Sequence, residues 1–189
     1  MVNKKYILAS GSPRRRELMA MLDVDFRVDT SKSVDEIVPE DLPAEEVPGF
    51  LSRLKAQPYL NELRENEVLI TADTVVILNG KVIGKPQNEA DAHRILTELA
   101  GHVHQVITGV TICHYGKTPE TFSELTEVEF DSLTKEEITY YVDKYQPLDK
   151  AGAYGIQEWI GAAAVKGIKG SFYNVMGLPI HRLYTALKD

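Results

Sequence analysis

The first 22 residues show a strand, a tight turn and a helix in direct succession, and this order constrains the fold more than any other feature. Lys5 to Ala9 is an apolar run that predicts a buried strand. Ser12 and Pro13 are the residue types preferred at a helix N-cap and at the first helical position. The apolar residues at helical spacing are Leu18, Met21 and Leu22. Such a unit indicates an α/β fold.

Similar patterns continue along the chain. Strands are expected at residues 25–28, 68–78, 81–84, 102–113 and 121–130, with a hairpin turn at Asn79-Gly80. Helices are expected from Val47 to Pro58, from Asn88 to Gly101, after a capping box of Thr134 and Glu137, and from about Pro179 onward. Residues 31–46 are acidic, contain two prolines and are expected to form a loop. These elements predict a mixed β-sheet flanked by helices.

Composition sets the broad class of the protein. Hydrophobic residues make up 43% of the 189 residues and charged residues 26%, which is typical of a globular protein. No repeat and no linker rich in Gly, Ser or Pro divides the chain, so a single domain over residues 1–189 is expected. The net charge of −7 argues against long nucleic acid as a partner. One cysteine, and no apolar stretch long enough for a signal peptide or a membrane span, favour a cytoplasmic protein without membrane attachment.

The junction between the first strand and helix carries unusual polar chemistry. Ser10, Gly11 and Ser12 supply hydroxyls and a flexible backbone, and Arg14 and Arg15 add two guanidinium groups. Arginine can bind two oxygens of one phosphate and stays charged at any working pH. Two interpretations stay open from these residues alone: an anion cradle, or a solvated basic turn with an ordinary helix cap.

Asp73 is a carboxylate in a strand, Ile70 to Val76, that is otherwise built from residues that prefer burial. It could bind a divalent metal or take a proton from water. Because carboxylates are mostly exposed, the competing interpretation is an aspartate on the outer face of a strand bend. From the residues around Asp73 alone, the exposed-face interpretation is favoured over the functional one.

Other polar residues are weaker candidates. The lysines beside helix ends or turns are Lys55, Lys85 and Lys150. They would bind phosphate only if they converge on one pocket. His102 and His104 face one way on a strand but lack a third ligand at zinc-like spacing, which favours a packed or exposed strand face. Cys113 is expected to be a core thiol, and Trp159 is either a rim aromatic or a packing residue.

Six segments stand in order between residue 7 and about residue 180. They are ILASGSPRR (7–15), ADTVV (72–76), GKP (84–86), HQVITGV (104–110), DKAGAYGIQ (149–157) and NVMGLP (174–179). Together they resemble the Maf family of nucleotide pyrophosphatases. Six matches in the right order over nearly the whole chain are far more specific than any one of them.

The resemblance implies an elongated α/β, ITPase-like fold with a cleft between two lobes, and frequent homodimers. It also implies hydrolysis of nucleoside triphosphates to monophosphate and pyrophosphate with Mg²⁺ or Mn²⁺. The late motif Tyr154-Gly155-Ile156-Gln157 is similar to that of the subgroup that acts on dTTP and UTP. The expected substrates are therefore dTTP, UTP and modified pyrimidine nucleotides.

The resemblance also assigns roles by position. The residues expected to hold the phosphates are Ser10, Arg14, Arg15, Lys55 and Lys85. Glu36 and Asp73 are expected to serve metal and water, with Asp73 as general base, and Thr74 and Gln157 to help select the substrate. The expected catalytic set is Asp73, Glu36, Lys55 and Lys85.

Some positions depart from the usual family pattern. They are Thr71 where glycine is common, Asp131 where arginine is frequent, Gln146 where glutamate is common, and Glu158-Trp159 where a glycine is frequent. The last lies nearest the expected base pocket and bears on substrate preference. The competing hypotheses are a catalytically silent, nucleotide-binding regulator of cell division and a structural, partner-binding protein. Pure binding gains nothing from a carboxylate beside phosphates unless a metal intervenes, so Asp73 argues for the enzyme.

Overall fold

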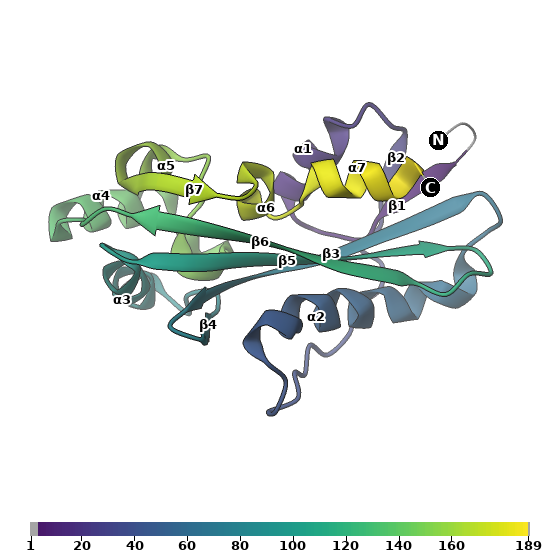
Figure 1. Ribbon diagram of the computed structural model, residues 1–189, viewed down its shortest axis with the longest axis horizontal. Helices are drawn as coiled ribbons and strands as arrows, with labels where there is room; N and C mark the ends of the chain where they lie inside the picture. Colours follow the sequence, from purple (N-terminus) through teal and green to yellow (C-terminus); the bar gives the residue numbers. More distant parts are fainter. Residues whose placement is uncertain (1–3, 189) are drawn as a thin grey trace. The chain divides into compact units, whose positions relative to one another are not determined.

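The computed structural model describes residues 4–188 as a mixed α/β structure (Figure 1). Its strands are β1 (Lys5–Leu8), β2 (Phe26–Val28), β3 (Glu67–Leu78), β4 (Lys81–Ile83), β5 (Val103–His114), β6 (Glu120–Phe130) and β7 (Val165–Lys169). Its α-helices are α1 (Pro13–Ala20), α2 (Val47–Ala56), α3 (Glu89–Leu99), α4 (Lys135–Tyr145), α5 (Trp159–Ala164), α6 (Phe172–Met176) and α7 (Ile180–Lys188). Short 3₁₀ helices are η1 (Ala44–Glu46), η2 (Gln57–Glu62), η3 (Pro147–Asp149) and η4 (Ala151–Ala153).

The strands over residues 4–188 form one seven-stranded sheet in the order β2-β1-β3-β5-β6-β7, with β4 paired to β3. β1 is parallel to β2 and to β3, whereas β4 is antiparallel to β3 and β7 to β6. Parallel neighbours need crossover connections, and α1 and α2 lie in the two connections β1 to β2 and β2 to β3. The expected mixed sheet flanked by helices is confirmed.

The chain divides into two compact units, and each is described by itself. The first unit contains residues up to Thr74, residues 108–124 and residues from Gly177 onward, and the second contains residues 75–107 and 125–176. Strands β3, β5 and β6 each begin in one unit and end in the other. The expectation of a single domain over residues 1–189 stays a prediction.

In the first unit, helices cover both faces of the sheet, with α1 and α7 on one face and α2 on the other (Figure 1). The apolar cluster on the α2 side contains Ile7, Ala56, Tyr59, Leu63, Leu69 and Cys113. α2 approaches β5 so closely that a Cβ on Gly109 would lie 2.3 Å from the carbonyl carbon of Pro48. Only glycine permits this approach, which places α2 directly against the strands.

In the second unit, α3 packs against α4 over one large apolar cluster. The Asn88 side chain caps α3, and Thr134 and Glu137 form a reciprocal capping box at the start of α4. The inner face of α3 is Ala92, Ile95, Leu96 and Leu99, all of which are buried as their helical spacing predicts.

The structure corrects one detail of the first helix. Met21 was expected on the buried face, but α1 ends at Ala20 and the Met21 side chain is 55% exposed. Leu18 is buried as expected, Leu22 is partly buried, and Met19 takes the inner position that was expected of Met21. The buried face lies between Leu18 and Met19, and helical geometry turns position 21 away from it. Among residues 4–188, no helix is both long enough and apolar enough to cross a membrane.

Candidate functional site

Asp73 and Lys55 lie together where β3 faces α2. The Lys55 ammonium is 2.5 Å from Asp73 Oδ1 and 3.2 Å from Glu36 Oε1, so one cation contacts two carboxylates. Two residues before Asp73 on β3, the buried Thr71 hydroxyl donates to the Ser52 carbonyl at 2.7 Å, one helical turn before Lys55. This bond sets the register between strand and helix and brings Asp73 to Lys55.

The structure argues against the exposed-face interpretation of Asp73, and its role toward metal or water stays a prediction. Its side chain is only 13% exposed and forms a close ion pair, whereas an aspartate on an outer strand face would be solvated. Glu36 comes from the long segment between β2 and η1, and its side chain is 49% exposed. The three charged groups expected from the sequence at this place are brought together.

These residues fit a divalent metal of the Mg²⁺ type. Such ions bind one or two carboxylates and complete their coordination with water and substrate phosphates, rather than using a cage of protein ligands. Among residues 4–188 there is no group of three or more His, Cys, Asp or Glu that could form such a cage. Asp73 and Glu36 both contact the Lys55 ammonium, so their carboxylates lie close together. They supply the oxygen donors that this mode of metal binding requires.

Arg15 forms hydrogen bonds to several segments of this region. Its Nε donates to Gly177 O at 2.8 Å, one terminal nitrogen donates to Ala72 O at 2.9 Å and to Ser10 Oγ at 3.4 Å, and the other donates to Thr74 Oγ1 at 3.0 Å. Desolvation lowers the pKa of Arg15, although nearby Asp73 opposes the shift. Because these contacts use most of its donors, the Arg15 fork ties α1 to β3 and to the segment before α7.

The other residues of the strand-to-helix junction surround this arginine. Ser12 caps α1, with its hydroxyl accepting from the Arg15 amide at 3.4 Å. Ser10 is buried, and its hydroxyl accepts from the Ser12 amide at 3.3 Å. Arg14 is partly buried on the first turn of α1. The Thr74 hydroxyl, expected to help select the substrate, is already engaged by Arg15 and by Thr108 at 2.9 Å.

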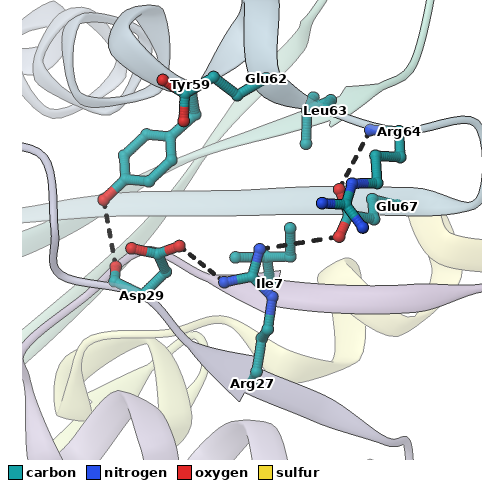
Figure 2. Close-up of a pocket in the computed structure, with 8 residues that line it drawn as sticks. All are labelled: Ile7, Arg27, Asp29, Tyr59, Glu62, Leu63, Arg64 and Glu67. Carbon is teal, nitrogen blue, oxygen red and sulfur yellow. Dashed lines mark hydrogen bonds and ion pairs between the residues drawn. The ribbon is translucent and has the colours of Figure 1, made fainter.

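The pocket in Figure 2 includes Asp29, the first residue of the long segment between β2 and η1. It has a volume of about 580 Å³ and contains Arg27, Asp29 and Tyr59 among its lining residues. The Tyr59 hydroxyl donates to Asp29 O at 3.2 Å and accepts from the Lys32 amide at 3.3 Å. Hydrogen bonds from Ser31 and Arg27 lower the pKa of Asp29 to about 2. Tyr59, one turn beyond Lys55, thus fixes the start of the segment that leads to Glu36.

Lys85 and Gln157 belong to the second unit. Both are exposed, Lys85 just after β4 and Gln157 in the loop before α5. The loop itself is firmly held, because Tyr154 is buried with its hydroxyl 2.7 Å from His104 Nε2. Gly155 donates its amide to the Tyr141 hydroxyl at 3.0 Å. Gln157 therefore projects from a fixed backbone.

Several weaker candidates have structural roles. Burial lowers the pKa of His104 to about 4 and its ring contacts Phe130 edge-on, so it is a core residue rather than part of a metal pair with exposed His102. Cys113 is buried, which raises the pKa of its thiol to about 11, and the expectation of a core thiol is confirmed. Trp159 packs against the core of the second unit.

Sequence reasoning missed several residues that position the candidate site. Thr71 was noted only as a departure from glycine, yet its hydroxyl is the tie between β3 and α2. Tyr59 is not singled out by any sequence motif, and the partners of its hydroxyl are far along the chain. A polar residue within an apolar run is the signal that could have identified Thr71.

Comparisons with known proteins bear on the family. Residues 5–189 match the family model described as Maf-like protein. A relative from Bacteroides thetaiotaomicron named dTTP/UTP pyrophosphatase is 55% identical over 182 residues, covering 96% of this chain and 94% of the relative. A relative of the same name from Porphyromonas gingivalis is 50% identical over 190 residues, covering 98% and 95%.

A solved structure agrees on the fold alone. The HAM1 protein from Coxiella burnetii has a TM-score of 0.50 and 18% identity, with 98% of both chains covered. The family model matches nearly all of the sequence, and relatives are 50–55% identical to it over nearly their whole length. This chain therefore belongs to the Maf family.

Proposed function

We propose that the protein is a nucleoside triphosphate pyrophosphatase that hydrolyses dTTP and UTP to the monophosphate and pyrophosphate. The observation that carries this proposal is the cluster of Asp73, Lys55 and Glu36, in which a strand carboxylate and a helix ammonium meet at 2.5 Å. Relatives at 50–55% identity that are named dTTP/UTP pyrophosphatase support the choice of substrate. Modified pyrimidine nucleotides belong to the same proposed substrate class.

In the proposed reaction, a water oxygen attacks the α phosphorus and the bond from that phosphorus to the bridging oxygen breaks. Asp73 accepts the water proton, since a carboxylate on rigid strand β3 can be held within reach of the water. Lys55 offsets the charge that develops on the departing pyrophosphate. A divalent metal held by Asp73 and Glu36, Mg²⁺ or Mn²⁺, would supply further positive charge against the polyanion.

The phosphate-binding role is assigned to the start of α1. Arg14 and Ser10 are the proposed phosphate contacts there, and Arg15 keeps them in place through its bonds to β3 and Gly177. The second unit is proposed to contribute Lys85 toward phosphate charge and Gln157 toward the base. An amide offers one donor and one acceptor, the complement of the N–H and carbonyl on the edge of uracil or thymine.

We also propose an oligomeric state, a cellular location and a class of partner for the protein. A homodimer, a cytoplasmic location and the absence of long nucleic acid as a partner follow from the sequence and from the family resemblance. Size-exclusion chromatography with light scattering would test the dimer, for which a mass of twice 21.1 kDa is expected. A catalytically silent regulator is not favoured, because relatives at half identity carry an enzyme's name.

The experiment that tests the function separates binding from turnover. We would measure pyrophosphate release from dTTP, UTP, CTP and GTP with Mn²⁺, with Mg²⁺ and with a chelator. Binding of a UTP analogue with a methylene bridge between the α and β phosphates would be followed by calorimetry. The proposal expects release from dTTP and UTP that stops with the chelator. Tight binding of the analogue without release from any nucleotide would establish a silent binding protein instead.

A further inference from the structure

A buried tyrosine of α4 holds the backbone of the loop that carries Gln157. Tyr141 is fully buried, and its hydroxyl accepts a hydrogen bond from the Gly155 amide at 3.0 Å. The same hydroxyl donates its only proton to Glu158 Oε2. One phenol therefore connects two positions of the loop, one on each side of Gln157.

Glu158 is held at both of its carboxylate oxygens. While Oε2 accepts from Tyr141, Oε1 lies 3.3 Å from the Lys150 ammonium, which also lies 2.8 Å from Asp149. The side chains of Lys150 and Glu158 are only 10% and 19% exposed. A largely buried carboxylate with partners on both oxygens cannot change rotamer without losing them, so this group is rigid.

The fit around Gly155 shows how closely these groups pack. A Cβ built on Gly155 would lie 2.9 Å from Glu158 Cδ and 3.2 Å from Gln157 Nε2. The carboxylate and the Gln157 amide thus both lie against the backbone atoms that Tyr141 binds. Tyr154 anchors the other end of the loop through His104. Gln157 is exposed, but the surface from which it projects is fixed.

We propose that Tyr141, Glu158 and Lys150 are positioning residues that set the orientation of the Gln157 amide and thereby the preference for uracil and thymine over cytosine. This inference rests on the proposed function and on the assignment of Gln157 to the base. To hydrogen-bond with a paired donor and acceptor of the base, the amide must lie within about 0.5 Å of the position that suits both bonds. On the edge beside C4, cytosine has an acceptor where uracil has its N–H donor and an amino donor where uracil has its carbonyl acceptor. An amide held in one orientation therefore favours uracil, and a loosened amide loses more toward UTP than toward CTP.

The test measures kcat/KM for UTP and CTP in the wild-type protein and in Tyr141→Phe. Loss of the hydroxyl should lower the UTP to CTP ratio by roughly tenfold. Tyr145→Phe is the matched control, because Tyr145 stacks on Tyr141 from the same helix and its hydroxyl has no part in the cluster. This control should keep the wild-type ratio. A purely structural role for Tyr141 would lower activity on both nucleotides equally and would overturn the inference.

A double-mutant cycle shows whether Tyr141 acts through Gln157. If it does, adding Tyr141→Phe to Gln157→Ala should change the ratio no further, whereas independent effects would multiply and contradict the inference. If Tyr141→Phe fails to fold, Glu158→Gln decides the question by the same ratio, since Glu158 lies nearer the surface. A wild type that releases pyrophosphate with equal preference for UTP and CTP overturns this inference alone. A wild type that releases none overturns the proposed function as well.

Discussion

At the scale of single residues, the site depends on which charges are already paired. Lys55 contacts two carboxylates, and Arg15 is bound to backbone oxygens and hydroxyls, although both looked from the sequence like phosphate ligands of equal kind. Lys85, in contrast, is exposed. Residues of one charge type therefore differ in how fully they are already paired, and substitution of Arg15, which is bound to backbone oxygens, should have a different effect from substitution of the exposed Lys85.

Asp73→Asn should keep the fold and lose roughly 10² to 10⁴ in kcat, because the amide has nearly the same shape but cannot accept a proton or bind metal tightly. Asp143→Asn, at an exposed position of α4, is the matched control and should behave as wild type. Steady-state assays with dTTP, together with circular dichroism, would check both. Wild-type turnover in the Asp73 variant would remove Asp73 from the catalytic set.

Arg15→Ala should destabilise the protein, although the sequence indicates only a phosphate ligand at this position. The substitution leaves the Ala72 and Gly177 carbonyls without their guanidinium donor, at a cost of about 2 kcal/mol. For a chain of this size, that corresponds to roughly 4–8 °C in melting temperature. Lys85→Ala removes an exposed charge and should melt within about 1 °C of wild type. Equal melting temperatures would show that the Arg15 contacts contribute little.

At the scale of elements, the long helices and strands could be predicted because their signals are local. The Asn79-Gly80 turn has positive φ at both residues, 52° and 75°, and joins β3 to β4 as expected. α5, β7 and α6 were missed. α5 and α6 have only six and five residues, and α5 passes directly into β7 at Val165 without a glycine or proline between them. In these elements tertiary packing, rather than local preference, selects the structure.

The candidate site could be predicted in part for the same reason. Asp73, Lys55 and Glu36 were named through the family resemblance, and they converge in space. The engagement of Arg15 with Gly177 could not be predicted, because it joins residues 162 positions apart through a backbone oxygen that no side-chain pattern reveals. Long-range bonds to backbone atoms leave almost no trace in sequence.

The contact between α2 and β5 gives a prediction about the element that carries Lys55. Gly109→Ala places a methyl group 2.3–2.4 Å from the backbone of Pro48 and Gly49, so α2 must move away from the sheet. We expect a loss of about 3 kcal/mol or more in stability, and reduced turnover because Lys55 moves with α2. Gly167→Ala is the control, since its Cβ meets only a Glu129 oxygen at 3.8 Å. Urea unfolding of both variants would show the difference, and equal midpoints would contradict the packing described.

At the scale of the whole molecule, two compact units share three long strands, and each unit holds part of the proposed machinery. The first contains Asp73, Lys55, Glu36 and the start of α1, and the second contains Lys85 and Gln157. The expected cleft between two lobes stays a prediction. Each unit has its own apolar cluster. A buried titratable side chain in the second unit can therefore report on the stability of that unit.

His104 is expected to make the free energy of unfolding depend on pH. Burial lowers its pKa to about 4, while the unfolded chain binds that proton near pH 6.5. Between these values the unfolded state carries the extra proton, so stability must fall as pH drops from about 6.5 to 4, by up to about 3 kcal/mol. Urea unfolding across this range should show the slope in wild type and in His102→Gln, where an exposed histidine is lost. His104→Gln should flatten it, and an unchanged slope would assign the effect to another group.

The most direct test of water attack at the α phosphorus is to find which product contains the oxygen of labelled water. The purified protein would be incubated with UTP and Mn²⁺ in water enriched in ¹⁸O, and the products identified by mass spectrometry. Attack at the α phosphorus predicts UMP that carries one ¹⁸O atom and pyrophosphate without label. Production of UDP and orthophosphate, or label in the pyrophosphate, would contradict a site in which Asp73 directs water to the α phosphorus.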